Sequence, residues 1–187
     1  MKEKTRKLSK DELDAKVTKR RQFVSIEQID SREQLSATGL VGSKGAGFFT
    51  VGVIVDKIGV LTSKGGKRFT ILRISDLVKY EMVRVKEQLT RLYGSDQEGL
   101  KFALKAFGSD GYKSLSVMAF GDCALPSKSI PSGTVIAVLN PRLMPPSSNA
   151  EKQQGLTFCI DTSDAIVQIG FSKEFNICVG ESVHPVT

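Results

Sequence analysis

The residue types that most often carry catalysis or bind metal ions are scarce in this sequence and far apart. Its single histidine, His184, would have to serve any Ser-His-Asp or Cys-His arrangement, and we expect it to lie in a frayed C-terminal tail. The three cysteines are Cys123, Cys159 and Cys178, and none belongs to a C-x-x-C pair of the kind that structural zinc sites use. We therefore expect separate buried thiols in a reducing compartment, no metal or other cofactor, and no enzymatic activity.

A glycine-rich turn superficially resembles a phosphate-binding loop. Gly65 and Gly66 precede Lys67 and Arg68, but a loop of that type has Ser or Thr after its lysine and joins a strand to a helix. Here an arginine takes that position, and the flanking residues predict strands on both sides of the turn. The turn is therefore interpreted as the tip of a β-hairpin.

Positive charge and one aromatic ring gather on this hairpin and on a second loop. The first turn is residues 63–66 (SKGG), and the second is residues 141–155. The candidate nucleic-acid-binding residues of the two regions are Lys57, Lys64, Lys67, Arg68, Phe69, Arg73, Arg142 and Lys152. Cations at such turns neutralise phosphates, and an aromatic side chain stacks on a base. The competing interpretations are a solvated hairpin tip and a core position for Phe69.

The elements that must position these residues are mostly short β-strands. Alternating or β-branched apolar residues between Gly, Pro, Asn and Ser turns predict strands over residues 49–57, 67–75, 115–121, 134–139, 156–161 and 165–170. Gly52 is expected to mark a bend or bulge in the first of them. The fold class is therefore predicted as mainly β, a five-stranded Greek-key OB-fold barrel whose two loops overhang one binding face.

A helical insertion is predicted between the second and third strands, over residues 77–114. Its first helix covers residues 77–93, capped by Ser75 and ended by Gly94. Its second helix covers residues 95–108 and starts with the capping-box pattern S-x-x-E. The apolar stripe of the second helix is Leu100, Ala103, Leu104 and Phe107.

Composition divides the chain into a basic tail and a nearly neutral body. Residues 1–22 hold nine Lys and Arg against four Asp and Glu, a net +5 of the chain's +7. We expect a disordered tail there, a lead-in linker over 23–47, the OB-fold domain over 48–180 and a C-terminal tail over 181–187. The small charge of the body argues against a firm grip on duplex DNA by charge alone. No apolar run approaches the roughly 18 residues of a membrane span, so no membrane partner is expected.

Several short segments resemble, in their order and spacing, the central domain of one replication family. They are residues 21–24 (RQFV), 50–57 (TVGVIVDK), 66–69 (GKRF), 74–77 (ISDL), 120–121 (FG), 131–135 (PSGTV), 139–141 (LNP) and 169–170 (IG), followed by Cys178. Together they are similar to the minichromosome maintenance protein ten family of eukaryotic DNA replication initiation factors.

This resemblance implies an OB fold that binds single-stranded DNA in the nucleus. It also implies contacts with DNA polymerase alpha, the sliding clamp and the replicative helicase. It gives DNA-facing roles to Lys57, Lys67 and Arg68. The family's degenerate clamp-binding box corresponds here to a partner-binding segment with Gln153, Leu156 and Phe158, although the same residues also suit a strand.

Three departures from the family pattern bear on affinity. Phe49 and Leu72 stand where the family has tryptophans, and the helical insertion has no counterpart in the family. The family also continues beyond the equivalent of Cys178 into a zinc finger whose other ligands are missing here. We therefore expect weaker DNA binding and keep two alternatives: a protein-interaction module without significant nucleic-acid binding, and an RNA-binding OB protein.

Overall fold

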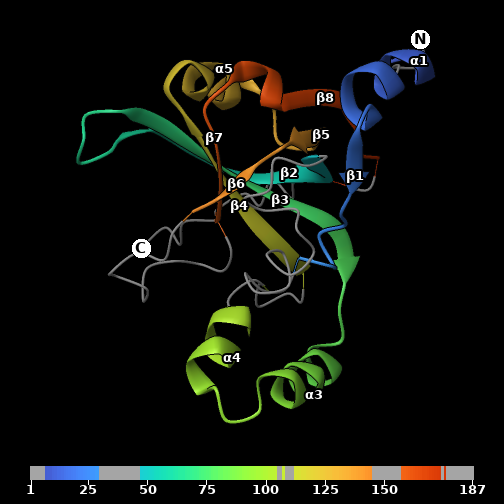
Figure 1. Ribbon diagram of the computed structural model, residues 1–187, viewed down its shortest axis with the longest axis vertical. Coiled ribbons are helices and arrows are strands. Elements are labelled where there is room, and N and C mark those ends of the chain that lie inside the picture. Colours follow the sequence, from blue (N-terminus) through green and yellow to red (C-terminus); the bar gives the residue numbers. More distant parts are fainter. Residues whose placement is uncertain are drawn as a thin grey trace, which may run out of the picture.

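The chain folds mainly into β-strands that form one sheet (Figure 1). The computed structural model describes residues 7–29, 47–104, 107, 112–144, 157–173 and 175. The strands are β1 (Arg21–Phe23), β2 (Gly47–Thr62), β3 (Arg68–Lys79), β4 (Tyr112–Phe120), β5 (Thr134–Leu139), β6 (Arg142–Leu143), β7 (Thr157–Ile160) and β8 (Ile166–Phe171). The predicted mainly β class is confirmed, and each of the six predicted strands overlaps one of these.

The long strand β2 organises the sheet because it changes partners along its length. Its first half pairs with β5 as far as Val53, and its second half pairs with β3 from Val53 to Thr62. Gly52 lies at this change of partner. A Cβ there would come within 2.9 Å of the Ile26 side chain and 3.1 Å of Ile74, so close packing explains the glycine.

The hydrogen-bonded order of the strands is β6-β7-β4-β3-β2-β5-β8, with β1 added to the start of β2. Strand β7 runs parallel to β4, and β8 runs antiparallel to β5. Although β7 and β8 lie toward opposite ends of this order, they follow each other along the chain, separated by the short 3₁₀ turn η4 (Ser163–Ala165). The described strands number eight, so a closed five-stranded barrel is not confirmed in that detail.

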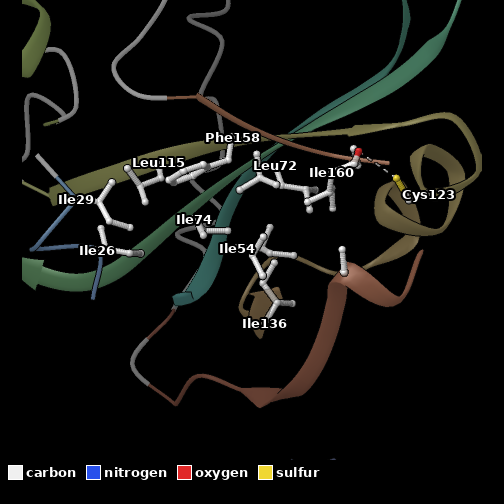
Figure 2. Packing of buried hydrophobic residues seen from close by; sticks show 14 of the residues in the cluster. Ile26, Ile29, Ile54, Leu72, Ile74, Leu115, Cys123, Ile136, Phe158 and Ile160 are labelled. Carbon is white, nitrogen blue, oxygen red and sulfur yellow. Dashed lines mark hydrogen bonds between the residues drawn. The ribbon is translucent and has the colours of Figure 1, made fainter. Parts of the chain in front are cut away.

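One hydrophobic core fills the inward side of the sheet (Figure 2). Core side chains that are at most 1% exposed include Leu72, Ile74, Leu115, Val117 and Ile136. Ile26 and Ile29, from the segment predicted as a linker, join this core on one side of the cluster in Figure 2. The turn η2 (Gly121–Cys123), which leads into helix α5 (Ala124–Ser129), joins it on the other side through Cys123. Segments outside the sheet therefore complete the core.

The N-terminal segment packs on the other side of the sheet. A capping box of Ser9 and Glu12 starts α1 (Lys10–Leu13), which continues into the π-helical turn η1 (Asp14–Thr18). Its buried residues belong to a second apolar cluster of Val17, Phe49, Ala137 and Leu139. Where the sequence predicts a disordered tail, the structure thus has helical turns from Lys10 and the strand β1. The reason is that Leu13 and Val17, four residues apart, form a short apolar stripe among the charges.

The predicted helical insertion is present as α3 (Met82–Tyr93) and α4 (Gln97–Leu104), beyond one end of the sheet (Figure 1). Strand β3 extends to Lys79, so the first helix begins later than predicted. Asp96, not Ser95, caps the second helix by accepting the Gly99 amide at 2.9 Å. The apolar stripe packs in a cluster of its own, with Val85, Leu89, Leu100 and Ala103 buried. Among the described residues, no helix is long and apolar enough to cross a membrane.

Candidate nucleic-acid interface

The outward face of β3 and β4 carries a row of side chains that crosses five strands. Residues 72 and 74 of β3 and residues 115, 117 and 119 of β4 are buried in the core, so the residues between them point to the opposite face. The strand register places in one row Ile58 of β2, Ile71 of β3, Met118 of β4, Cys159 of β7 and Arg142 of β6. With about 4.8 Å between neighbouring strands, this outward row is roughly 19 Å long.

An aromatic pair lies beside the outward row, toward the tip of the β2–β3 hairpin. Phe69 and Phe120 are register partners, with ring centroids 5.4 Å apart and ring planes inclined by 35°. Both residues are half-buried, and Leu61, which lies opposite Phe69 on β2, is 41% exposed. Phe69 therefore belongs to the outward face and not to the core, which is the position that base stacking requires.

The hairpin tip carries three cations, and in Figure 1 the hairpin between β2 and β3 projects away from the sheet. The turn is closed by hydrogen bonds from the Gly66 amide to Ser63 O and from the Ser63 amide to Lys67 O, each 2.9 Å long. Gly66 adopts φ +77°, a conformation that favours glycine. Lys64, Lys67 and Arg68 are exposed, and their side chains make no hydrogen bond or ion pair with any residue that the structure describes.

Lys57 and Arg73 are held by other parts of the protein. The Lys57 ammonium donates to Lys128 O at 3.1 Å and to Ile130 O at 2.7 Å, the carbonyls at the C-terminal end of α5. Its register partner is Leu72, a core residue, so its side chain leaves the outward face. Arg73 remains on that face but donates to Ser114 Oγ at 2.9 Å. Of the predicted hairpin cations, Lys57 is therefore separated from the group at the tip.

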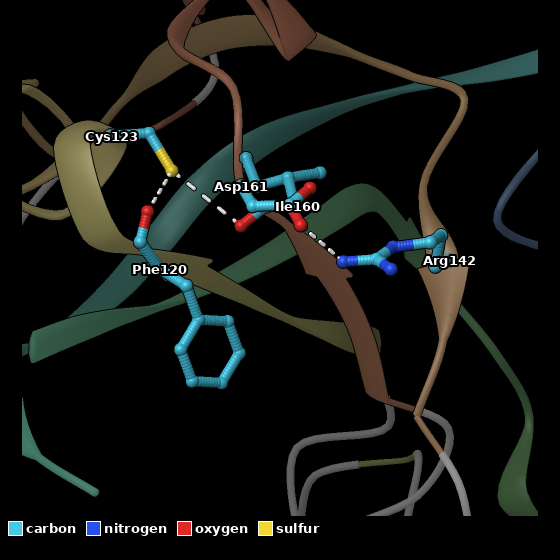
Figure 3. Close-up of polar contacts among 5 residues, drawn as sticks. All are labelled: Phe120, Cys123, Arg142, Ile160 and Asp161. Atoms are coloured by element: carbon cyan, nitrogen blue, oxygen red, sulfur yellow. Dashed lines mark hydrogen bonds and ion pairs between the residues drawn. The ribbon is translucent and has the colours of Figure 1, made fainter. Parts of the chain in front are cut away.

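The second predicted loop contributes one described cation. Arg142 lies at the end of the outward row and forms an ion pair with Asp161, which Figure 3 shows between β6 and the end of β7. Lys152, Gln153 and Leu156 lie outside the described residues.

Phe158 requires a correction. The family resemblance implies that Phe158 contacts a protein partner. However, the side chain is 0% exposed, and its ring packs edge-on against Phe48 with the centroids 5.9 Å apart. Alternation along β7 turns this residue inward, so Phe158 is a core residue and its ring cannot contact a partner.

Two cysteines border the interface. The Cys123 thiol donates to Phe120 O at 2.7 Å and to Ile160 O at 3.5 Å, which joins the ends of β4 and β7 (Figure 3). Burial raises the pKa of the Cys123 thiol. Burial also raises the pKa of Cys159, against an opposing effect of Arg142. Both thiols are therefore protonated at neutral pH and are poor nucleophiles. Within the described part of the chain, no three His, Cys, Asp or Glu side chains come together as metal ligands would.

Sequence reasoning missed the apolar half of this face. Ile71, Met118 and Phe120 were assigned only to strands, and Ile58 and Leu61 lie beyond the predicted end of the first strand at residue 57. The signal was present in residues 115–120, where inward Leu115, Val117 and Ala119 leave Met118 and Phe120 on the other face.

Comparisons with known proteins found low-level likenesses among solved structures. No family model matches the chain, and no curated protein matches it. A structure of the protein priB from Ralstonia solanacearum is similar with a TM-score of 0.37 and 12% identity over 64% of this chain and 93% of that one. The OB domain of Ta0387 from Thermoplasma acidophilum is similar with a TM-score of 0.38 and 13% identity over 88% of this chain and 99% of that one. None of these comparisons identifies the minichromosome maintenance protein ten family.

Proposed function

We propose that this chain is a nucleic-acid-binding OB-fold module, not an enzyme, and that it holds a single strand across the outward face of β3 and β4. The strand connections support the fold assignment. Because β7 pairs with β4 while β8 pairs with β5, the two short strands can be regarded as halves of one fifth strand interrupted at η4. Helix α5 then lies between the third and fourth barrel strands, and the face of the second and third strands is the one that OB folds use for oligonucleotides.

The observation that carries the proposal is the half-exposed aromatic pair next to three cations that have no partner among the described residues. Phe69 and Phe120 offer ring surface for bases, and Lys64, Lys67 and Arg68 can reach the phosphates that flank a stacked base. Stacking requires bases that are not already paired in a duplex. The face is apolar in its middle and charged near its ends, so single strands should bind better than duplexes.

Fluorescence anisotropy with single-stranded DNA, duplex DNA and RNA across a salt series tests this proposal. Charge reversal of Lys64, Lys67 and Arg68 together should reduce the slope of log K against log salt concentration by about 2 for a single strand. Phe120→Ala should weaken binding about tenfold. Phe23→Ala is the matched control, because Phe23 is 52% exposed but lies outside the β3–β4 face. No binding at low salt, or equal effects of Phe120→Ala and Phe23→Ala, would overturn the proposal.

The alternative of a protein-interaction module would use the amphipathic helical insertion, with its stripe of Leu100, Leu104 and Phe107, to hold a partner. Leu100 is buried, and Leu104 and Phe107 pack against the same cluster within the helical insertion. No observation therefore favours that stripe as a docking site over the outward face as a nucleic-acid site.

A more specific assignment, to the minichromosome maintenance protein ten family, rests on the sequence resemblance alone. It would place the chain in DNA replication in the nucleus, with DNA polymerase alpha, the sliding clamp and the helicase as partners, and with DNA as the preferred strand. Stronger binding of RNA than of single-stranded DNA in the anisotropy series would remove the basis for that finer assignment.

A further inference from the structure

A small pocket opens at the Arg142 end of the outward row. Its volume is about 150 Å³, and Cys159 and Arg142, which end the row, are among the residues that line it. The lining comes from β1, the turn after β5, β6, and the connection between β7 and β8. The pocket is partly open to solvent, so a planar base larger than the enclosed volume can enter it by one edge.

The charges of the pocket do not suit a phosphate. Arg21 and Arg142 contribute two positive charges, and Asp161 and Asp164 contribute two negative charges. Two carboxylates beside the ligand repel an anion by about as much as two guanidinium groups attract it. A neutral molecule with both donors and acceptors at its edge fits such a lining better.

Several polar side chains of the pocket already have partners within the protein, so only the remaining ones can select the ligand. Asp161 pairs with Arg142, while the side-chain amide of Asn140 lies 3.3 Å from both Phe48 O and Arg21 Nε. The carboxylate of Asp164 is exposed and has no hydrogen bond or ion pair with any described residue. Arg142 keeps N–H groups beyond the one that meets Asp161, because a guanidinium has five. Among the described lining groups, the free ones therefore include the Asp164 carboxylate and N–H groups of Arg142. The Thr162 hydroxyl and the N–H groups that Arg21 does not donate to Lys16 O and Val17 O are also free.

We infer that this pocket receives one guanine base. Among the nucleobases, guanine has two adjacent donors, N1–H and the 2-amino group, that match the two oxygens of a carboxylate, and an acceptor, O6, that matches an arginine. Asp164 takes the donors and Arg142 takes O6. The inference rests on the proposed function, because a strand lying along the outward row would bring one of its bases to Arg142. It goes further by assigning a base preference to a face that otherwise binds any sequence.

The test compares oligonucleotides that differ at one base. A thymidine-only strand is compared by anisotropy with the same strand carrying one guanine, one hypoxanthine or one adenine. The guanine strand should bind about tenfold tighter than the adenine strand. Hypoxanthine, which lacks the 2-amino group, should recover only part of the gain. Asp164→Asn should abolish the preference, so that the guanine and adenine strands bind with equal affinity. Asp122→Asn, an exposed acid at the corresponding position of η2, is the matched control and should keep the preference.

The pocket can also be tested without any strand. Two-dimensional NMR with GMP, IMP or AMP should show GMP shifting the amides of residues 162–165 most, and Asp164→Asn should remove that difference. Strand binding without a guanine preference, or a preference that survives in Asp164→Asn, overturns the inference and leaves the proposed function intact. Failure of every strand to bind while GMP still shifts these amides refutes the proposed function but supports the pocket.

Discussion

Lys57 illustrates that a cation near a binding face can stabilise the fold instead of contacting the ligand. Its ammonium donates to two carbonyls at the end of α5, and positive charge at a helix C-terminus is favourable. We predict that Lys57→Met lowers the free energy of unfolding by about 1.5 kcal/mol, measured by urea denaturation, because both carbonyls lose a charged donor. Its effect on oligonucleotide affinity should be small.

Lys67→Met is the comparison for that variant, since the Lys67 side chain is exposed and unpaired within the described residues. It should change the free energy of unfolding by no more than about 0.5 kcal/mol and should weaken oligonucleotide binding. If Lys57→Met instead weakened binding more than Lys67→Met at unchanged stability, the capping role of Lys57 would be wrong.

Cys123 should make the free energy of unfolding fall at alkaline pH. Burial raises the pKa of its thiol, so the folded state keeps the proton to a higher pH than the unfolded chain does. The resulting stability is fully present below the usual thiol pKa of 9.0 and is lost as the pH rises through the raised value. Urea denaturation between about pH 8 and about pH 10 should show stability falling with pH. The fall should be shallower in Cys123→Ala, and equal slopes in the two proteins would contradict the prediction.

At the scale of elements, apolar runs and turn residues predicted six of the eight described strands, but not what covers them. Residues 134–139 were predicted with the bounds of β5, because turn residues flank a continuous apolar run. Residues 115–121 overlap β4, where buried residues repeat every second position from 115 to 119. Alternation cannot tell which of two apolar faces meets the core. That is why Phe69 remained open between core and surface, whereas Phe158 was assigned to a partner by the family resemblance.

The helical insertion should be dispensable for the sheet. Its apolar side chains form their own cluster, and Lys79 and Tyr112 are direct register partners on β3 and β4 at its base. We predict that replacing residues 80–111 with an Asn-Gly turn, which suits a two-residue hairpin, gives a protein that still unfolds in one cooperative transition. Circular dichroism should show loss of helical signal with retained β signal. Loss of cooperative unfolding would mean that the insertion is part of the main folding unit.

At the scale of the whole molecule, the sheet has apolar residues on both faces and needs a cover on each. Cys123 and Ile130, which flank α5, complete the inner core together with Ile26, whereas α1 and η1 cover the outer side of β5 and β8. The basic N-terminal segment thus contributes packing as well as most of the net charge, which the charge pattern of residues 1–22 did not indicate. Leu13 and Val17 are two apolar side chains among nine cations and four acids, too few to predict a packed element without knowledge of its partner surface.

Val17 tests whether this N-terminal cover is part of the cooperative fold. Its side chain is 1% exposed against Phe49 and Leu139, so Val17→Asp would bury a carboxylate among apolar side chains. We predict a loss of at least about 3 kcal/mol in the free energy of unfolding, from lost burial and from the cost of the charge. Ala15→Asp, at an exposed position of the same turn, should change it by no more than about 0.5 kcal/mol. A Val17→Asp protein with the urea midpoint of Ala15→Asp would show that the segment unfolds by itself, and the domain would then begin at β1 or β2.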